Sequence, residues 1–116
     1  MQIEVTTDNN VEGSDALIRQ LEADVHAALS RFGDRLTRVE VHLGDENAAK
    51  KGGDDKRCVL EARPAGQPPV VVTNHASTLD KACGGALQKL QNLLERRFGR
   101  LDDKKGGDTI RQNEDR

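Results

Sequence analysis

Four short stretches of the chain have the polarity pattern of β-strands. In residues 2–7, Ile3 and Val5 fall on one side of an extended chain, and Glu4 falls on the other. An apolar residue at every second position is typical of a strand with one buried face. Further along, the same alternation recurs twice, and a run of valines follows two prolines. We therefore predict strands at residues 2–7, 38–43 and 56–63, and a fourth strand that begins at Val70.

The first of two longer stretches places apolar residues at helical spacing between Leu17 and Phe32. This spacing predicts a helix over residues 15–32 with one apolar face. Ser14 can accept hydrogen bonds from the N–H groups of the first turn, and Gly33 can adopt the left-handed conformation that ends many helices. Both boundary residues therefore support the predicted helix.

The second stretch predicts a helix that begins after Ser77 or Thr78 and carries an apolar stripe as far as Leu101. The pair Gly84 and Gly85 is unusual inside it, because each glycine costs about 1 kcal/mol relative to alanine in a helix. The close approach of another backbone would explain the pair.

The predicted element order is β-α-β-β-β-α, which indicates an α+β fold. Two helices with one apolar stripe each can cover one face of a four-stranded sheet, and the last three strands form an antiparallel meander. Residues 44–55 are expected to form a mobile loop. The domain is expected over residues 1–101, with residues 102–116 as a polar, disordered tail. The uncovered sheet face should present Gln2, Glu4, Glu40, His42, Glu61 and Arg63 to solvent.

Length and composition indicate one small domain of a cytoplasmic protein. The chain has 116 residues, of which 34% are hydrophobic, and its two aromatic residues are Phe32 and Phe98. It contains neither a run of about 18 apolar residues nor a secretory signal pattern, so we expect no membrane span and no leader. Cys58 and Cys83 are too few for a disulfide framework, and we expect both thiols to be reduced and buried.

The net charge of −2 hides an uneven distribution along the chain. Residues 1–34 hold two basic and seven acidic residues, whereas residues 81–105 hold seven basic and three acidic residues. A local rather than a global positive field would therefore have to attract a polyanion. A solvated helix face with ordinary cations is the simpler interpretation of the charge alone.

Catalytic and metal-binding patterns are not recognisable in the chain. The three histidines, His26, His42 and His75, fall on three different predicted elements, and the two cysteines form no CxxC pair. No nucleophile stands beside a base, and none of the glycine pairs has the context of a phosphate-binding loop. We therefore predict a protein that is not an enzyme and that uses no metal, cofactor or small-molecule substrate.

The remaining chemical signal is a set of basic residues on and near the helices. With two aromatic residues, base stacking of the single-strand type is not expected, but guanidinium and ammonium groups can contact the phosphates of structured RNA. We expect a patch from the first helix to come within reach of a stripe on the second if both helices share a sheet face. The candidate RNA-binding residues are Arg31, Arg35, Arg38, Lys81, Lys89, Arg96, Arg97 and Arg100.

Three stretches of the chain carry a family resemblance. Residues 1–12 cover the first strand and the approach to the first helix, residues 32–43 cover the passage into the second strand, and residues 88–97 belong to the last helix. In this order and spacing they resemble the ribosome hibernation-promoting factor family, also called ribosome-associated inhibitors or sigma-54 modulation proteins. The resemblance covers most of residues 1–101.

This resemblance implies a fold similar to double-stranded-RNA-binding domains and a role in bacterial translation regulation under stress. It implies binding in the decoding channel of the small ribosomal subunit, where basic residues contact 16S-type ribosomal RNA. It also implies no membrane partner and a monomer off the ribosome. The 15 residues after Leu101 are too few for the second, dimerising domain of the long family form, so the chain resembles the short form.

A second hypothesis remains open, in which the same fold serves as a protein-interaction module without ribosome binding, for example as a modulator of a transcription factor. The first helix carries Glu22 and Asp24 and has Ala28 where the family often has a lysine. At the start of the last helix, Thr78 to Asp80 lack the aromatic residue that the family has there. Co-sedimentation with ribosomes would separate the two hypotheses.

Overall fold

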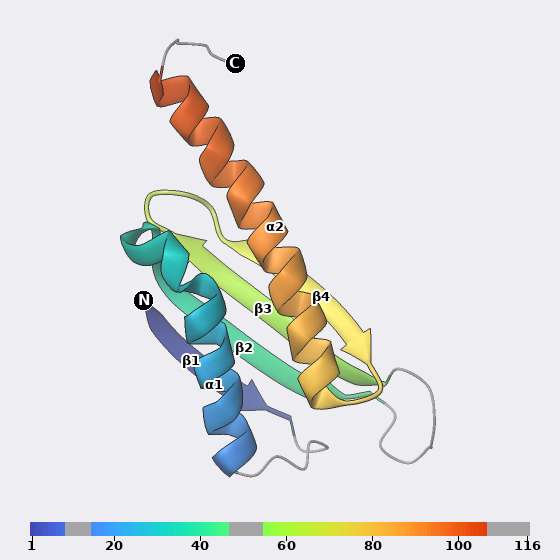
Figure 1. Cartoon of the computed structure of the whole chain (residues 1–116). Coiled ribbons are helices and arrows are strands. Elements are labelled where there is room, and N and C mark those ends of the chain that lie inside the picture. Colours follow the sequence, from blue (N-terminus) through green and yellow to red (C-terminus); the bar gives the residue numbers. More distant parts are fainter. Residues whose placement is uncertain (9–14, 47–54, 107–116) are drawn as a thin grey trace.

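A computed structural model describes residues 1–8, 15–46 and 55–106, with side chains described as far as Gly99. Within these residues, four strands form one sheet in the order β1-β2-β3-β4 (Figure 1). The first strand pairs parallel to the second, and the other pairs are antiparallel. The strands are β1 (Gln2–Thr7), β2 (Leu36–Asp45), β3 (Lys56–Pro64) and β4 (Val70–Ala76).

The helices α1 (Asp15–Leu29) and α2 (Leu79–Gly106) lie on the same face of this sheet (Figure 1). The parallel pairing of β1 with β2 requires a crossover, which α1 provides. The predicted α+β class, element order and single covered face are confirmed. The comparison with double-stranded-RNA-binding domains stays a prediction.

The end of the first helix differs from the prediction. The α-helix stops at Leu29, and a 3-10 helix, η1 (Ser30–Arg35), leads into β2. Gly33 has φ of 54° inside this segment, a conformation that costs glycine little and other residues more. The ψ of Gly33 is −130°, which is not the left-handed helical value, so the predicted helix-ending conformation is wrong although φ is positive. The predicted cap Ser14 lies outside the described residues.

The second helix begins as predicted and continues further. Thr78 caps it, because the backbone N–H of Lys81 donates to Thr78 Oγ1 at 3.1 Å. The helix continues to Gly106, past the boundary predicted at Leu101, and residues 107–116 of the predicted tail lie outside the described part. Residues 47–54 of the predicted loop also lie outside it. No helix in the described part is long and apolar enough to span a membrane.

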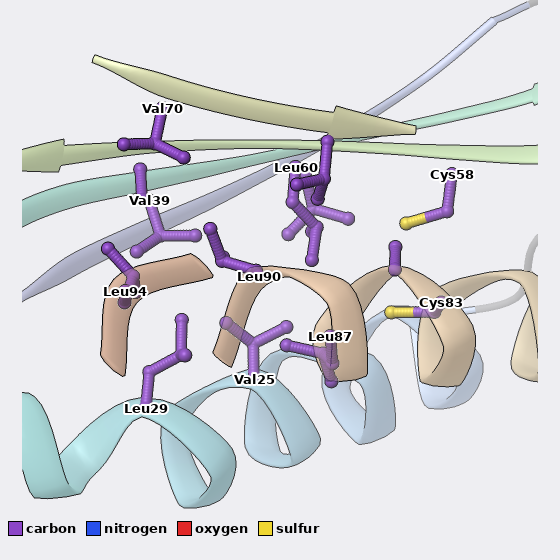
Figure 2. Packing of buried hydrophobic residues seen from close by; sticks show 14 of the residues in the cluster. Val25, Leu29, Val39, Cys58, Leu60, Val70, Cys83, Leu87, Leu90 and Leu94 are labelled. Carbon is purple, nitrogen blue, oxygen red and sulfur yellow. The ribbon is translucent and has the colours of Figure 1, made fainter. Parts of the chain in front are cut away.

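The core is a single layer of aliphatic side chains between the sheet and both helices. Figure 2 shows Val25 and Leu29 of α1 and Leu90 and Leu94 of α2 directed into the layer that the sheet side chains enter. Val39 of β2 is among the fully buried residues there. The strand alternation and the helical stripes therefore identified the buried faces correctly.

Both cysteines belong to this core and are free, as predicted. Cys58 of β3 is 0% exposed and Cys83 of α2 is 2% exposed. The thiol of Cys58 hydrogen-bonds that of Cys83, and this bond, together with burial, raises the pKa of Cys58 above its ordinary value. The same hydrogen bond lowers the pKa of Cys83, because it stabilises a thiolate there.

Of the two adjacent glycines in α2, only Gly85 has a close neighbour that leaves no room for a side chain. A Cβ atom on Gly85 would lie 2.1 Å from Nδ2 of Asn74 in β4, whereas one on Gly84 would meet nothing within 4 Å. The close neighbour is therefore a side chain and not the backbone that we predicted. Asn74 Nδ2 donates to the Ala82 carbonyl at 3.2 Å, which keeps this amide against the helix.

Candidate nucleic-acid interface

Arg31 of η1 reaches across to the second helix. Its Nη2 lies 3.0 Å from Glu95 Oε1 and donates to Gln91 Oε1 at 3.3 Å, and its guanidinium lies 4.8 Å from the Phe32 ring centre. The charged side chains of Arg31 and Glu95 are 49% and 51% exposed, so solvent screens the pair, which contributes about 0–1 kcal/mol. A phosphate could therefore replace Glu95 as the partner of Arg31 at small cost.

Arg35, one turn further along η1, is positioned by an aromatic ring of α2. Its guanidinium lies 4.9 Å from the centre of the Phe98 ring, a cation–π distance. Phe98 in turn packs against Phe32, with 5.6 Å between ring centres. The two rings are only 6% and 9% exposed, so they hold the arginines and offer no surface for base stacking.

Two more arginines lie on the same part of α2. Arg97 Nη1 donates to the Pro68 carbonyl before β4 at 3.0 Å. Arg96 is exposed, and its guanidinium makes no hydrogen bond or ion pair within the described ranges. Arg31, Arg35, Arg96 and Arg97, which we call the arginine end, therefore lie at one level along the C-terminal half of α2, with Arg31 and Arg35 on its α1 side and Arg97 on its β4 side.

Lys81 and Lys89 lie outside the arginine end. Lys81 is exposed in the first turns of α2. It is about 24 Å from Arg97 along the helix, at about 1.5 Å per residue. Lys89 Nζ donates to the Thr73 carbonyl of β4 at 2.9 Å, on the flank of α2 away from Arg31. The predicted stripe on α2 is therefore spread along the helix. Arg100 continues α2, but its side chain lies outside the described part.

Arg38 was wrongly assigned to the same patch. It precedes the buried Val39 in β2, so strand alternation directs it to the uncovered sheet face, away from both helices. There it bonds Glu4, and its Nε donates to Glu40 Oε2 at 2.9 Å. The hydrogen bond to Glu40 raises the pKa of Arg38. Its alternation with Val39 could have excluded Arg38 from the helical side.

The sequence prediction also missed Glu95, the acidic residue inside the arginine end. Its contact with Arg31 joins residues 64 positions apart, so no local spacing signals it. Arg31 and Arg35 do contact α2, through Glu95 and Phe98, while the predicted adjacency to its basic residues stays a prediction.

Comparisons with known proteins place the chain among ribosome-related sequences. A family described as "Sigma 54 modulation protein / S30EA ribosomal protein" matches residues 3–102. The Thermus thermophilus Protein Y N-terminal domain has a similar fold, with a TM-score of 0.65 and 23% identity over 83% of this chain and 98% of that one. A ribosomal subunit interface protein from Coxiella burnetii also has a similar fold, with a TM-score of 0.69 and 16% identity over 85% of this chain and 99% of that one. No curated protein sequence matches.

Proposed function

Since the chain belongs to the sigma 54 modulation protein / S30EA ribosomal protein family, we propose that it is a ribosome hibernation factor that inhibits translation by binding the small ribosomal subunit. Its partner is 16S-type ribosomal RNA near the decoding channel, and the contact is made by the arginine end. It acts in the cytoplasm, where ribosomes lie, as a monomer off the ribosome. The family is one of ribosome-associated factors and not of enzymes.

The observation that carries this proposal is that four arginines from two segments far apart in the chain lie at one level along α2, Arg31 and Arg35 on its α1 side and Arg97 on its β4 side. Arg96 is exposed and has no partner among the described side chains, and Arg31 has a weak, exposed one. Such groups can bind phosphates of folded RNA without base stacking. The packing of Arg35 on Phe98 limits its freedom, which lowers the entropy lost when it binds a phosphate.

The test is a salt titration of binding to isolated small ribosomal subunits. Reversing Arg35 and Arg96 to glutamate should weaken binding and reduce the slope of log K against log salt by about 0.7–0.9 for each lost phosphate contact. The matched control reverses Arg19 and Lys81, two exposed cations outside the arginine end, and changes the net charge equally. Arg19, Lys81 and Arg96 are exposed, so their reversal should change thermal stability little, whereas Arg35→Glu also loses the cation–π contact with Phe98, about 0.5–1 kcal/mol, and thermal melts measure that loss separately.

Equal loss of affinity in both double variants would show that total charge, and not the arginine end, controls binding. An unchanged salt slope in a folded Arg35→Glu/Arg96→Glu variant would remove the arginine end from the interface.

The second candidate is a protein-interaction module of the same fold, which the acidic first helix favours. Between Asp15 and Leu29 the chain carries Arg19 as its one permanent cation against Asp15, Glu22 and Asp24. This surface would repel RNA phosphates. If the wild-type protein fails to co-sediment with ribosomes at low salt, this second function replaces the first.

A further inference from the structure

Three side chains with metal-ligand chemistry meet on the uncovered face of the sheet. Glu40 and His42 are two residues apart in β2 and so point to the same face of the sheet, and Glu61 of β3 is the cross-strand partner of Glu40. One potential ligand atom from each of the three lies within 4.8 Å of the other two. All three side chains are partly buried by their neighbours, although no helix covers this face.

A hydrogen bond from β1 sets the orientation of the His42 ring. Thr6 Oγ1 donates to the Val41 carbonyl at 3.4 Å and lies 3.0 Å from His42 Nδ1. The hydrogen bond between Thr6 Oγ1 and Nδ1 fixes the plane of the ring, and its direction depends on the tautomer of His42. In the tautomer with its proton on Nδ1, the ring bonds Thr6 Oγ1 and has the lone pair of Nε2 available for a metal ion. A ligating histidine is usually oriented in this way, by a bond from its other nitrogen.

The other ring nitrogen of His42 faces a carboxylate oxygen of Glu40. Nε2 lies 3.3 Å from Glu40 Oε1. In a tetrahedral zinc site, with ligands about 2.0–2.2 Å from the ion, two ligand atoms are about 3.4 Å apart. The His42–Glu40 distance therefore already matches one edge of such a site, and a shift of the Glu61 carboxylate would complete three ligands.

The arginines of this face hold the carboxylates by their other oxygens. Arg38 Nε donates to Glu40 Oε2 at 2.9 Å, and Arg63 Nη2 lies 3.3 Å from Glu61 Oε2. These contacts orient the two carboxylates and leave Glu40 Oε1 facing His42. The guanidinium charges also repel a cation, so binding should be weaker than at a site without them.

We propose that Glu40, His42 and Glu61 bind one divalent transition metal ion, with a fourth position left for water. One imidazole nitrogen and two carboxylate oxygens are a donor set that suits Zn²⁺. The site lies on the sheet face opposite the arginine end, so it does not depend on RNA binding.

The experiment titrates the full chain with Zn²⁺ by calorimetry and with Co²⁺ by visible absorption. Wild type should bind one ion, and His42→Ala or Glu61→Gln should weaken binding by about tenfold or more. The control is His75→Ala, which removes a second histidine–glutamate pair, in which His75 Nε2 lies 2.8 Å from Glu46 Oε1. This control should bind as wild type does.

Several outcomes would overturn the proposal. These are the absence of binding to wild type, unchanged binding in His42→Ala, and an equal loss in His75→Ala. A thiolate-to-cobalt absorption band would assign the ion to Cys58 or Cys83 instead. Thermal melts establish whether each variant is folded. If His42→Ala is unfolded, Zn²⁺ binding to the isosteric variant Glu61→Gln tests the proposal in its place.

Discussion

The two adjacent glycines of α2 should respond to alanine with opposite signs. Gly84 is exposed, and a Cβ there would meet no atom within 4 Å. Gly84→Ala should therefore gain the helix propensity of alanine, about 1 kcal/mol. In a domain of this size that gain raises Tm by roughly 4–8 °C.

At Gly85 the same gain is opposed by Asn74. The new Cβ would lie 2.1 Å from Asn74 Nδ2 and 2.8 Å from its Cγ, so the whole amide must move. The movement breaks the bond to the Ala82 carbonyl, worth about 0.5–1.5 kcal/mol, and displaces a packed side chain, at about 1–3 kcal/mol. After the propensity gain of about 1 kcal/mol, Gly85→Ala should destabilise the fold by roughly 0.5–3.5 kcal/mol.

A double-mutant cycle isolates the contact between Asn74 and Gly85. Urea unfolding would be measured for Gly84→Ala, Gly85→Ala, Asn74→Ala and the Asn74→Ala/Gly85→Ala pair. In the Asn74→Ala background the clash is absent, so Gly85→Ala should now stabilise by about 1 kcal/mol. The reasoning is refuted if Gly85→Ala stabilises the wild-type background as much as Gly84→Ala does.

Three further predictions concern the core, the thiols and one surface ion pair. Leu90 is 0% exposed, so Leu90→Ala should cost about 2–5 kcal/mol of unfolding free energy in urea, and a cost below 1 kcal/mol would contradict its central position. Cys58 and Cys83 should react with a thiol reagent only as fast as the native structure opens, and rapid labelling of Cys83 without denaturant would show that its side chain is misplaced. The hydrogen bond from Arg57 lowers the pKa of Glu46. A group whose pKa is lower in the folded state stabilises the fold at pH values above its unfolded pKa. This contribution to stability is lost as the pH falls through the folded pKa. Glu46→Gln should therefore lose less stability than wild type when urea midpoints are compared between about pH 5 and pH 2.

The elements and their buried faces were predictable because each depends on neighbours in sequence. Ile3 and Val5 alternate with Glu4, and this pattern alone decides which side of β1 meets the helices. The same local logic restricted the cap of α2 to Ser77 or Thr78, and the structure shows that it is Thr78. The end of α1 was less predictable, because the 3-10 segment that follows it has side chains, Arg31 and Arg35, in contact with the distant helix α2.

The arrangement of the charged residues was not predictable in the same way. Glu95 meets Arg31 because two helices lie side by side, and sequence spacing contains no information on that contact. Glu61 joins Glu40 only through the register of β2 with β3. Groups of this kind depend on tertiary structure, so a search for closely spaced ligands misses them.

The bond from Lys89 to the Thr73 carbonyl also affects how the protein behaves at high concentration. β4 is an outer strand of the sheet, and the outer edge of a sheet can template pairing with another chain. With the Thr73 carbonyl occupied and an ammonium group over the strand, an approaching strand would have to displace a charge before it could pair. Lys89 thus protects the sheet against edge-to-edge aggregation, and a chain without this lysine would be more prone to form fibrils when crowded.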